Sequence, residues 1–264
     1  PHMLSLIKNR PLMMQRFPSG IEHEGFYQKN AGDYFPSWIK TVRVAKEGGS
    51  LDQVICNDAA TLVYLANQAC ITLHAWLSRY DKLDYPDRMI FDLDPSKHDF
   101  KVIRSIALEF KTVLEELGAT PFVMTTGSRG MHVVVPLNRV ATFEESRACA
   151  KDIARLMVQR DPKKLTIEIR KSERGGRVLI DYFRNAYAQT GVAPYSIRAK
   201  PGAPIATPLW WDEVKSSTLA SSQKYTLKNI YTRLKKSDDP WSDINDHAVS
   251  VKKLQKAVDA MLEK

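Results

Sequence analysis

Apolar residues return every three or four positions along five stretches of the chain, and this spacing predicts helices. The stretches cover residues 58–79, 99–117, 142–160, 221–235 and 248–264. Asp99 is a candidate N-cap for the second stretch, and Gly118 follows it as a candidate C-terminal cap. Thr142 and Glu145 have the spacing of a capping box, which fixes the start of the third helix.

Shorter apolar runs alternate with these stretches and predict strands. The runs cover residues 89–94, 122–126, 132–137, 165–169 and 178–183. Residues 127–130 predict a turn between the second and third strands, and Gly175 with Gly176 predicts a hairpin between the last two. The proline-rich residues 194–208 predict ordered but irregular chain. Strands, helices and hairpins in this order predict an α/β (α+β) fold with mixed sheets flanked by helices.

Composition limits the class of protein. The 264 residues are 44% hydrophobic and 26% charged, which is typical of a globular chain with one large domain or two closely packed subdomains. No apolar run is long enough for a membrane span, and the first residues do not resemble a signal peptide, so we expect a cytoplasmic protein that does not bind membranes. Residues 1–3 resemble an expression-tag remnant, which leaves residues 4–264 as a single domain.

Cysteine spacing and charge add two expectations. The three cysteines are widely spaced, which predicts reduced thiols rather than a disulfide framework or a zinc ribbon. The net charge is +9, and residues 161–264 carry 19 basic and 12 acidic side chains. A one-sided basic balance favours a polyanionic partner, most often a nucleic acid.

Three acidic residues interrupt strongly apolar strands. Asp92 and Asp94 are two residues apart, so a strand would project both carboxylates from one face while Phe91 and Leu93 occupy the other. Asp181 lies within the apolar residues 178–183. Neighbouring carboxylates repel, and hard divalent cations such as Mg²⁺ or Mn²⁺ neutralise oxygen donors of this kind. The alternatives are a helix N-cap cluster for the first two and a salt bridge for the third.

A glycine-containing turn and a basic cluster suit phosphate. Thr126, Arg129 and the exposed backbone of the turn offer donors to an anion, although an ordinary hairpin loop would look alike. His132 follows the turn, and His74 lies on the first predicted helix; a structural role is the simpler interpretation of each. Nine basic residues lie between positions 163 and 200, around Asp181, where they could form phosphate ligands or a solvated face.

Five ordered motifs carry a resemblance to a known family. They are FDLDP at residues 91–95, TGSRGMH at 126–132, IDYFRN at 180–185, APYSIR at 193–198 and PLWWDEV at 208–214. In this set and order the chain resembles the primase-polymerase domain of bacterial ligase D and its stand-alone relatives, members of the archaeo-eukaryotic primase superfamily. The resemblance runs from about residue 10 to residue 241.

The resemblance implies an archaeo-eukaryotic primase-like fold of two closely packed subdomains in one compact unit. It also implies template-dependent addition of ribonucleotides or deoxyribonucleotides to DNA 3′ ends, with gap filling and end bridging in non-homologous end joining. The substrates would be nucleoside triphosphates and gapped, 5′-phosphorylated or 3′-overhang DNA. Two Mn²⁺ or Mg²⁺ ions would serve as cofactors, and Ku and a DNA ligase would be partners, with a DNA-bridged dimer as a further expectation.

The same resemblance implies roles for individual residues. The metal-binding catalytic residues would be Asp92, Asp94 and Asp181. The nucleotide-binding residues would be His74, Thr126, Arg129, His132, Arg174, Arg184 and Arg198. The DNA-binding residues would be Arg16, Phe26, Tyr27 and Lys29, with Phe26 and Tyr27 as a pair that stacks on the template. Arg129 stands where many relatives have lysine, and Thr126 where serine is common.

Two other functions explain part of the pattern. An apolar strand that ends in Asp92 and Asp94 also opens haloacid-dehalogenase-type phosphatases, which need a later acidic pair such as Asp238 and Asp239. A non-catalytic nucleic-acid-binding module explains the positive charge. It leaves three acids on apolar strands unexplained, because unneutralised acids repel DNA.

Overall fold

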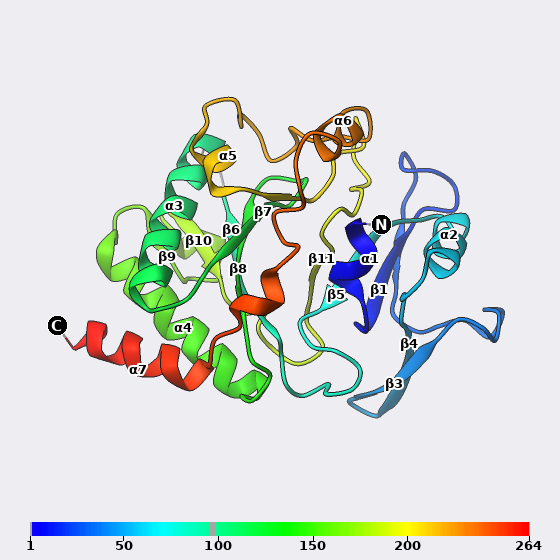
Figure 1. Cartoon of the computed structure of the whole chain (residues 1–264), viewed down its shortest axis with the longest axis horizontal. Helices are drawn as coiled ribbons and strands as arrows, with labels where there is room; N and C mark the ends of the chain where they lie inside the picture. Colours follow the sequence, from blue (N-terminus) through cyan, green and yellow to red (C-terminus); the bar gives the residue numbers. More distant parts are fainter. Residues whose placement is uncertain (1, 96–98, 264) are drawn as a thin grey trace.

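The computed structural model describes residues 2–95 and 99–263, and the described strands form three sheets (Figure 1). The largest sheet contains, in spatial order, β12 (Thr207–Leu209), β7 (Phe122–Thr125), β8 (Met131–Pro136), β6 (Arg88–Asp94), β10 (Val178–Asp181) and β9 (Leu165–Thr166). A four-stranded sheet contains β11 (Thr190–Val192), β5 (Cys70–Trp76), β1 (Leu12–Arg16) and β2 (Phe26–Gln28). β3 (Thr41–Lys46) and β4 (Gly49–Val54) form a separate hairpin.

Helices flank the sheets, and the first helix also contributes Leu6 to the core between the two larger sheets. The helices are α1 (His2–Ile7), α2 (Ala59–Asn67), α3 (Phe100–Glu116), α4 (Phe143–Arg160), α5 (Trp211–Lys215), α6 (Ile230–Leu234) and α7 (Val251–Leu262), with short 3-10 turns η1 (Lys171–Glu173) and η2 (Ile244–His247). Figure 1 shows α3 and α4 against the larger sheet and α2 beside the smaller one. The chain therefore has the predicted mixed architecture of sheets flanked by helices.

The two faces of the larger sheet have different partners. Phe91 and Leu93 of β6 point into a core shared with α3, α4 and α7, where Phe110 and Ile153 are also fully buried. Ile90 points the other way, into the layer between the two sheets. Alternation along β6 thus sends Asp92 and Asp94, which share the face of Ile90, toward the smaller sheet.

The two sheets are joined by a buried ion pair as well as by apolar packing. Ile90, Val192 and Trp241 belong to one core between the sheets. Arg10, just before β1, donates two hydrogen bonds of 2.6 and 2.7 Å to the carboxylate of Asp87, just before β6. Both side chains are buried, and Arg79 also donates to Asp87. The pair therefore links the residue before β1, in the smaller sheet, to the residue before β6, in the larger sheet.

Several predicted elements are present at nearly the predicted bounds. Strands β6, β7 and β8 match the predictions for residues 89–94, 122–126 and 132–137. The Asp99 side chain accepts from the Lys101 backbone, so it caps α3. Both hydrogen bonds of the Thr142–Glu145 capping box are present at the start of α4.

The predicted helix over residues 58–79 is wrong in its second half. α2 ends at Asn67, the chain turns at Ala69 with φ of 57°, and residues 70–76 form β5. β5 is paired on both sides and is covered on both faces, so its apolar residues do not alternate. His74 therefore lies on a central strand rather than on a helix.

The predicted hairpin at Gly175 and Gly176 is also wrong. β9 and β10 pair in parallel, and the two glycines lie in the loop that returns the chain between them. β9 ends at Thr166, which is earlier than predicted, and β10 ends at Asp181. Of the helix predicted over residues 221–235, the structure forms α6 alone, and α5 was not predicted. None of the helices described here has the length and apolarity needed to cross a membrane.

Candidate active site

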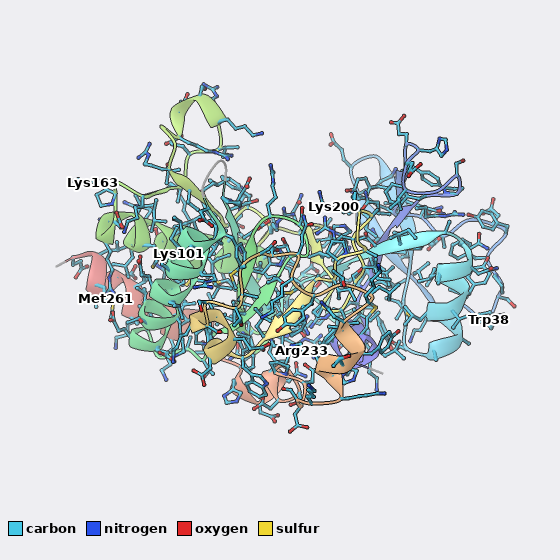
Figure 2. The ribbon with its side chains drawn as sticks, turned by 90° about the horizontal axis from the view of Figure 1, so that it is seen from above. Trp38, Lys101, Lys163, Lys200, Arg233 and Met261 are labelled. Atoms are coloured by element: carbon cyan, nitrogen blue, oxygen red, sulfur yellow. The ribbon has the colours of Figure 1, made fainter. Side chains whose placement is uncertain are left out.

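A cavity of about 210 Å³ lies where the larger sheet faces the smaller one. Its lining is mostly charged or polar: His74, Asp92, Asp94, Thr126, Ser128, Arg129, Gly130, His132, Leu179, Asp181, Arg184, Val192 and Arg198. Lys200, two residues beyond the lining residue Arg198, lies near the middle of the molecule in Figure 2. The structure thus gathers nine of the fourteen residues singled out in the sequence into one pocket.

Strand register places the three carboxylates together. Asp92 lies opposite Asp181 in the antiparallel pair of β6 and β10, and opposite His132 in the pair of β6 and β8. Asp94 is two residues farther along β6, opposite Leu179. Residues opposite one another in register share a face, so all of these side chains project toward the smaller sheet.

An arginine neutralises two of the acids. The Arg184 Nε donates a 2.8 Å hydrogen bond to Asp92 Oδ2 and lies 3.8 Å from Asp181 Oδ2. Burial alone would raise the pKa of the Asp92 carboxyl, but His132 and Arg184 hold that pKa well below its usual range. Burial raises the pKa of Asp181, and the nearby Asp92 carboxylate adds to this rise. Asp92 is therefore the more firmly ionised of the two.

Asp94 faces two other arginines. Its carboxylate lies 3.8 Å from Arg129 Nη2 and 3.9 Å from Arg174 Nη1. Arg174 is buried and also donates to the backbone oxygens of Glu168 and Ile169, which fixes its guanidinium beside the acid. Arg174 is thus next to the pocket, although it is outside the set of residues that line it.

The carboxylates of the pocket are the candidate ligands for a cation. Within residues 2–95 and 99–263, no three or more His, Cys, Asp and Glu side chains are arranged around one point as metal ligands. The chemistry of the pocket does suit hard cations, because carboxylate oxygens from two neighbouring strands are concentrated there. Arginine side chains supply the positive charge that these oxygens require.

The turn of residues 126–130 forms the part of the pocket wall next to the acids of β6. Gly127 has φ of 64°, and a Cβ there would lie 2.9 Å from the Ala206 nitrogen. A Cβ on Gly130 would lie 2.1 Å from the Leu93 oxygen, so only glycine allows the turn to approach β6 this closely. The Arg198 Nη1 donates to the Thr126 carbonyl at 2.9 Å. Thr126, Ser128, Arg129 and Gly130 of the turn therefore line the pocket beside Asp94, whose carboxylate lies 3.8 Å from Arg129.

Both predicted histidines line the pocket and are held largely away from solvent. Burial and the nearby positive charges of Arg198 and Arg184 lower the pKa of His74 to about 3, so its imidazole is neutral at neutral pH. Its Nε2 has no hydrogen-bond partner in the described structure. His132 Nε2 lies 3.6 Å from Asp92 Oδ2, and its Nδ1 also lacks a partner among the described residues.

The residues predicted to bind DNA lie outside the pocket, on or next to the smaller sheet. The Tyr27 ring meets His74 edge-on, with ring centroids 6.0 Å apart, so it adjoins the pocket. Phe26 precedes Tyr27 in β2 and therefore faces the opposite side of the strand. The Arg16 guanidinium lies over the Phe26 ring. Arg16 also donates to Gln28 and Tyr34. The two aromatic rings are exposed, but they do not lie on the same face of the strand.

Other residues of the site were not predicted. Leu179 and Val192 line the pocket through their places in β10 and β11. Asn185, buried, bonds through its side chain to both the N–H and the carbonyl of Ile90 and so fixes the segment that carries Arg184 to β6. An asparagine inside an apolar motif is the one available signal for that role. Asp238 lies in a separate surface pocket with Trp210 and Lys235, and neither Asp238 nor Asp239 lines the cavity of Asp92.

Comparisons with known proteins agree on one family. The family model described as LigD, primase-polymerase domain, matches residues 1–241. The chain is 32% identical over 244 residues to the bifunctional non-homologous end joining protein LigD of Bacillus subtilis, covering 92% of this chain and 39% of that protein. It is 31% identical over 244 residues to the multifunctional non-homologous end joining protein LigD of Pseudomonas aeruginosa, covering 91% and 29%. The chain thus spans well under half the length of these relatives.

A solved structure has the same fold. The polymerase domain of Mycobacterium tuberculosis ligase D, in complex with DNA, superimposes with a TM-score of 0.87 at 26% sequence identity. The superposition covers 94% of this chain and 88% of that one.

Proposed function

The chain belongs to the LigD primase-polymerase domain family, and from this membership we propose that it is a nucleotidyltransferase that extends DNA 3′ ends during non-homologous end joining. The observation that carries the proposal is the pocket in which Asp92, Asp94 and Asp181 face an anion-binding turn. Phosphoryl transfer requires carboxylates that hold metal ions close to hydrogen-bond donors that bind the phosphates. The fold neighbour bound to DNA supports DNA as the partner.

The three carboxylates would hold Mn²⁺ or Mg²⁺. Two such ions, when bound, lower the pKa of an attacking hydroxyl and stabilise charge on the leaving phosphate. In the protein described here Arg184 balances Asp92 and Asp181. Because that guanidinium is a side chain on a loop, it is free to exchange those carboxylates for the phosphates of a bound nucleotide.

The chain's own residues would bind and orient the nucleoside triphosphate. Backbone N–H groups of the 126–130 turn, with Arg129 and Arg198, offer donors to the phosphates. His74 is neutral, so it can accept or donate a hydrogen bond to the nucleotide without adding charge. His132, beside Asp92, is close to the acids as well as to the turn.

DNA would approach along the smaller sheet. Tyr27 adjoins His74 at the edge of the pocket, and an exposed aromatic ring stacks on a base without requiring a particular sequence. Phe26 and Arg16 would contact the DNA strand from the opposite side of β2. The exposed Lys29 lies just after β2. We include gapped, 5′-phosphorylated or overhanging ends as substrates, and Ku, a DNA ligase and a DNA-bridged dimer as partners of the same reaction.

Primer extension with wild type and Asp92→Ala tests the proposal. The substrate is a short-gapped, 5′-phosphorylated DNA with Mn²⁺ and either ribonucleotides or deoxyribonucleotides. We expect wild type to add nucleotides. We expect Asp92→Ala to lose at least about a hundredfold in rate, because it removes a carboxylate that would hold the metal ions, and loss of one group that stabilises transition-state charge costs about this much.

The folded state is the control in this experiment. Asp92→Ala should keep the melting temperature of wild type within a few degrees, because it removes a carboxylate that burial disfavours and leaves Arg184 beside the Asp181 carboxylate. Retained activity in Asp92→Ala would overturn the assignment of Asp92. Tight binding of gapped DNA by a wild type that adds no nucleotide would instead support a non-catalytic end-binding module.

A further inference from the structure

The shape of the 126–130 turn is set in part by residues that never reach the pocket. Ser222 and Gln223 lie more than ninety positions later in the chain and are absent from the pocket lining. We propose that Ser222 and Gln223 are positioning residues, which hold the turn in the conformation that receives the triphosphate of the incoming nucleotide. This inference rests on the proposed function, because it assigns the turn to a triphosphate.

Ser222 and Gln223 hold two alternate carbonyls of the turn. Ser222, only 1% exposed, donates from Oγ to the Gly130 carbonyl at 2.8 Å. Its Oγ also lies 3.4 Å from Thr126 Oγ1, which itself donates to the same carbonyl. Gln223 donates from Nε2 to the Ser128 carbonyl at 2.9 Å. Neither Ser222 nor Gln223 lines the cavity, whereas Ser128 and Gly130, whose carbonyls they hold, do.

Holding these carbonyls decides where the N–H groups point. In a trans peptide the carbonyl and the following N–H point in opposite directions. The bond from Gln223, which does not line the pocket, to the Ser128 carbonyl therefore turns the Arg129 N–H away from Gln223. The Arg129 N–H donates to no acceptor within the described chain, so it is available to an anion.

The turn has few bonds of its own with which to keep this shape. Inside it, the Thr126 N–H reaches the Gly130 carbonyl at 3.1 Å, and the Ser128 N–H reaches Thr126 Oγ1 at 3.3 Å. Gly127 and Gly130 are glycines, whose backbone has more conformational freedom than that of any other residue. External bonds are therefore needed to select one conformation of the turn.

The segment that carries Ser222 and Gln223 is itself fixed. Tyr225, two residues later, accepts from the Ile205 N–H through its carbonyl and donates from its hydroxyl to Glu213. Arg233 donates to the same Glu213 carboxylate at 2.7 Å. Because this support does not depend on the turn, the segment can hold the turn in one conformation.

The experiment compares Ser222→Ala with Ser146→Ala. Ser146 is also 1% exposed, but its Oγ has no hydrogen-bond partner in the described structure and it lies on α4, behind the larger sheet. The two substitutions remove the same hydroxyl from equally buried sites. A purely structural role of Ser222 would lower the stability of Ser222→Ala and would leave phosphate binding unchanged in both variants.

We expect Ser222→Ala to raise the KM for nucleoside triphosphate about 3- to 10-fold, which is the effect of one lost hydrogen bond. The kcat at saturating nucleotide and the Kd for gapped DNA should change less than about twofold, because the acids and the DNA surface are untouched. Inorganic tripolyphosphate, titrated by calorimetry, should bind more weakly to the same extent. Ser146→Ala should match wild type in all three measurements.

Gln223→Met is the second variant, because it keeps the length of a partly exposed side chain and removes only the donor to Ser128. It should raise the KM in the same direction even if Ser222→Ala does not fold. Wild-type values of KM and of tripolyphosphate affinity in both variants would overturn the positioning role. If wild type binds tripolyphosphate but adds no nucleotide, the proposed function fails while the tripolyphosphate arm still decides the inference. If wild type binds no tripolyphosphate, both are wrong.

Discussion

Two carboxylates of the pocket have pKa values shifted in opposite directions, although they lie opposite each other on neighbouring strands. Burial raises the pKa of Asp181, whereas His132 and Arg184 outweigh burial at Asp92 and lower its pKa. The difference follows from geometry, since the Arg184 Nε is 2.8 Å from Asp92 and 3.8 Å from Asp181. Substituting Asp92 therefore removes the more strongly ionised carboxylate of this pair.

Arg198 should act on the nucleotide rather than on DNA. It lines the pocket and holds the Thr126 carbonyl, so Arg198→Ala loses both a guanidinium donor and a support of the turn. We expect its KM for nucleotide to rise about 10- to 100-fold, the range for hydrogen bonds to charged groups. The Kd for gapped DNA should change less than about twofold, as measured by fluorescence anisotropy.

Arg155→Ala provides the matched control for that variant. Arg155 is an exposed arginine of α4 that pairs with Asp152, far along the chain from any pocket residue. Arg155→Ala removes the same charge and should leave the KM for nucleotide and the Kd for gapped DNA unchanged. If Arg198→Ala loses as much DNA affinity as nucleotide affinity, Arg198 belongs to the DNA surface instead.

At the residue scale, the sequence could predict those site residues whose type is unusual in their context. Asp92, Asp94 and Asp181 stand out because acids are rare inside apolar strands, and period-two alternation puts the first two on one face. Ser222 and Gln223 could not be found in this way. They act on backbone carbonyls, which every residue carries, and they come from a polar stretch distant in sequence.

At the element scale, the predictions succeeded where one periodicity applied and failed where burial hid it. α4 has an apolar face, a polar face and a capping box, and all three are visible in the sequence. β5 is buried on both faces between β1 and β11, so its apolar residues fit a helical spacing as well as a strand. The parallel pairing of β9 and β10 depends on contacts with β6 that no local pattern records.

The joint between the two sheets should depend on the pair of Arg10 and Asp87. Arg10→Met leaves the Asp87 carboxylate buried without its bidentate partner, so we expect the free energy of unfolding to fall by about 3–5 kcal/mol. Urea denaturation at pH 7 measures this change. Arg43→Met, which breaks the exposed pair of Arg43 and Asp52, is the control and should leave the urea midpoint unchanged.

The same pair gives a pH dependence of known sign. Burial would raise the pKa of Asp87, but Arg10 and the other arginines lower it to about 2. The unfolded carboxyl has a pKa near 3.9, so the stabilisation is complete above about pH 4 and is lost as pH falls toward 2. Asp87→Asn should be less stable at pH 7 and should lose less stability than wild type over that interval. A wild-type pH profile in Asp87→Asn would show that other groups cause the acid transition.

At the scale of the whole molecule, positive charge is concentrated in the part of the chain that surrounds the pocket. Residues 161–264 hold 19 basic and 12 acidic side chains, and several of the basic ones surround the acids of β6 and β10. Arg170 and Lys171 are exposed at η1, a turn that is connected to the pocket through the buried Arg174. In Figure 2 this turn projects from the body of the molecule, so its charges are accessible to a polyanion.

The position of these charges, rather than the net charge of +9, should determine the salt dependence of DNA binding. Each phosphate contact contributes about 0.9 to the slope of log K against log of salt concentration on duplex DNA. We therefore expect Arg170→Ala with Lys171→Ala to reduce the measured slope for gapped DNA by about 1 to 2, with the KM for nucleotide unchanged.

Lys252→Ala with Lys253→Ala removes the same charge from the exposed face of α7, which lies beside α4 (Figure 1). This control should retain the wild-type slope, because counterion release counts phosphates that are contacted and not charge at a distance. Equal reductions in both double variants would mean that the overall field of the protein attracts DNA and that η1 makes no contact with it.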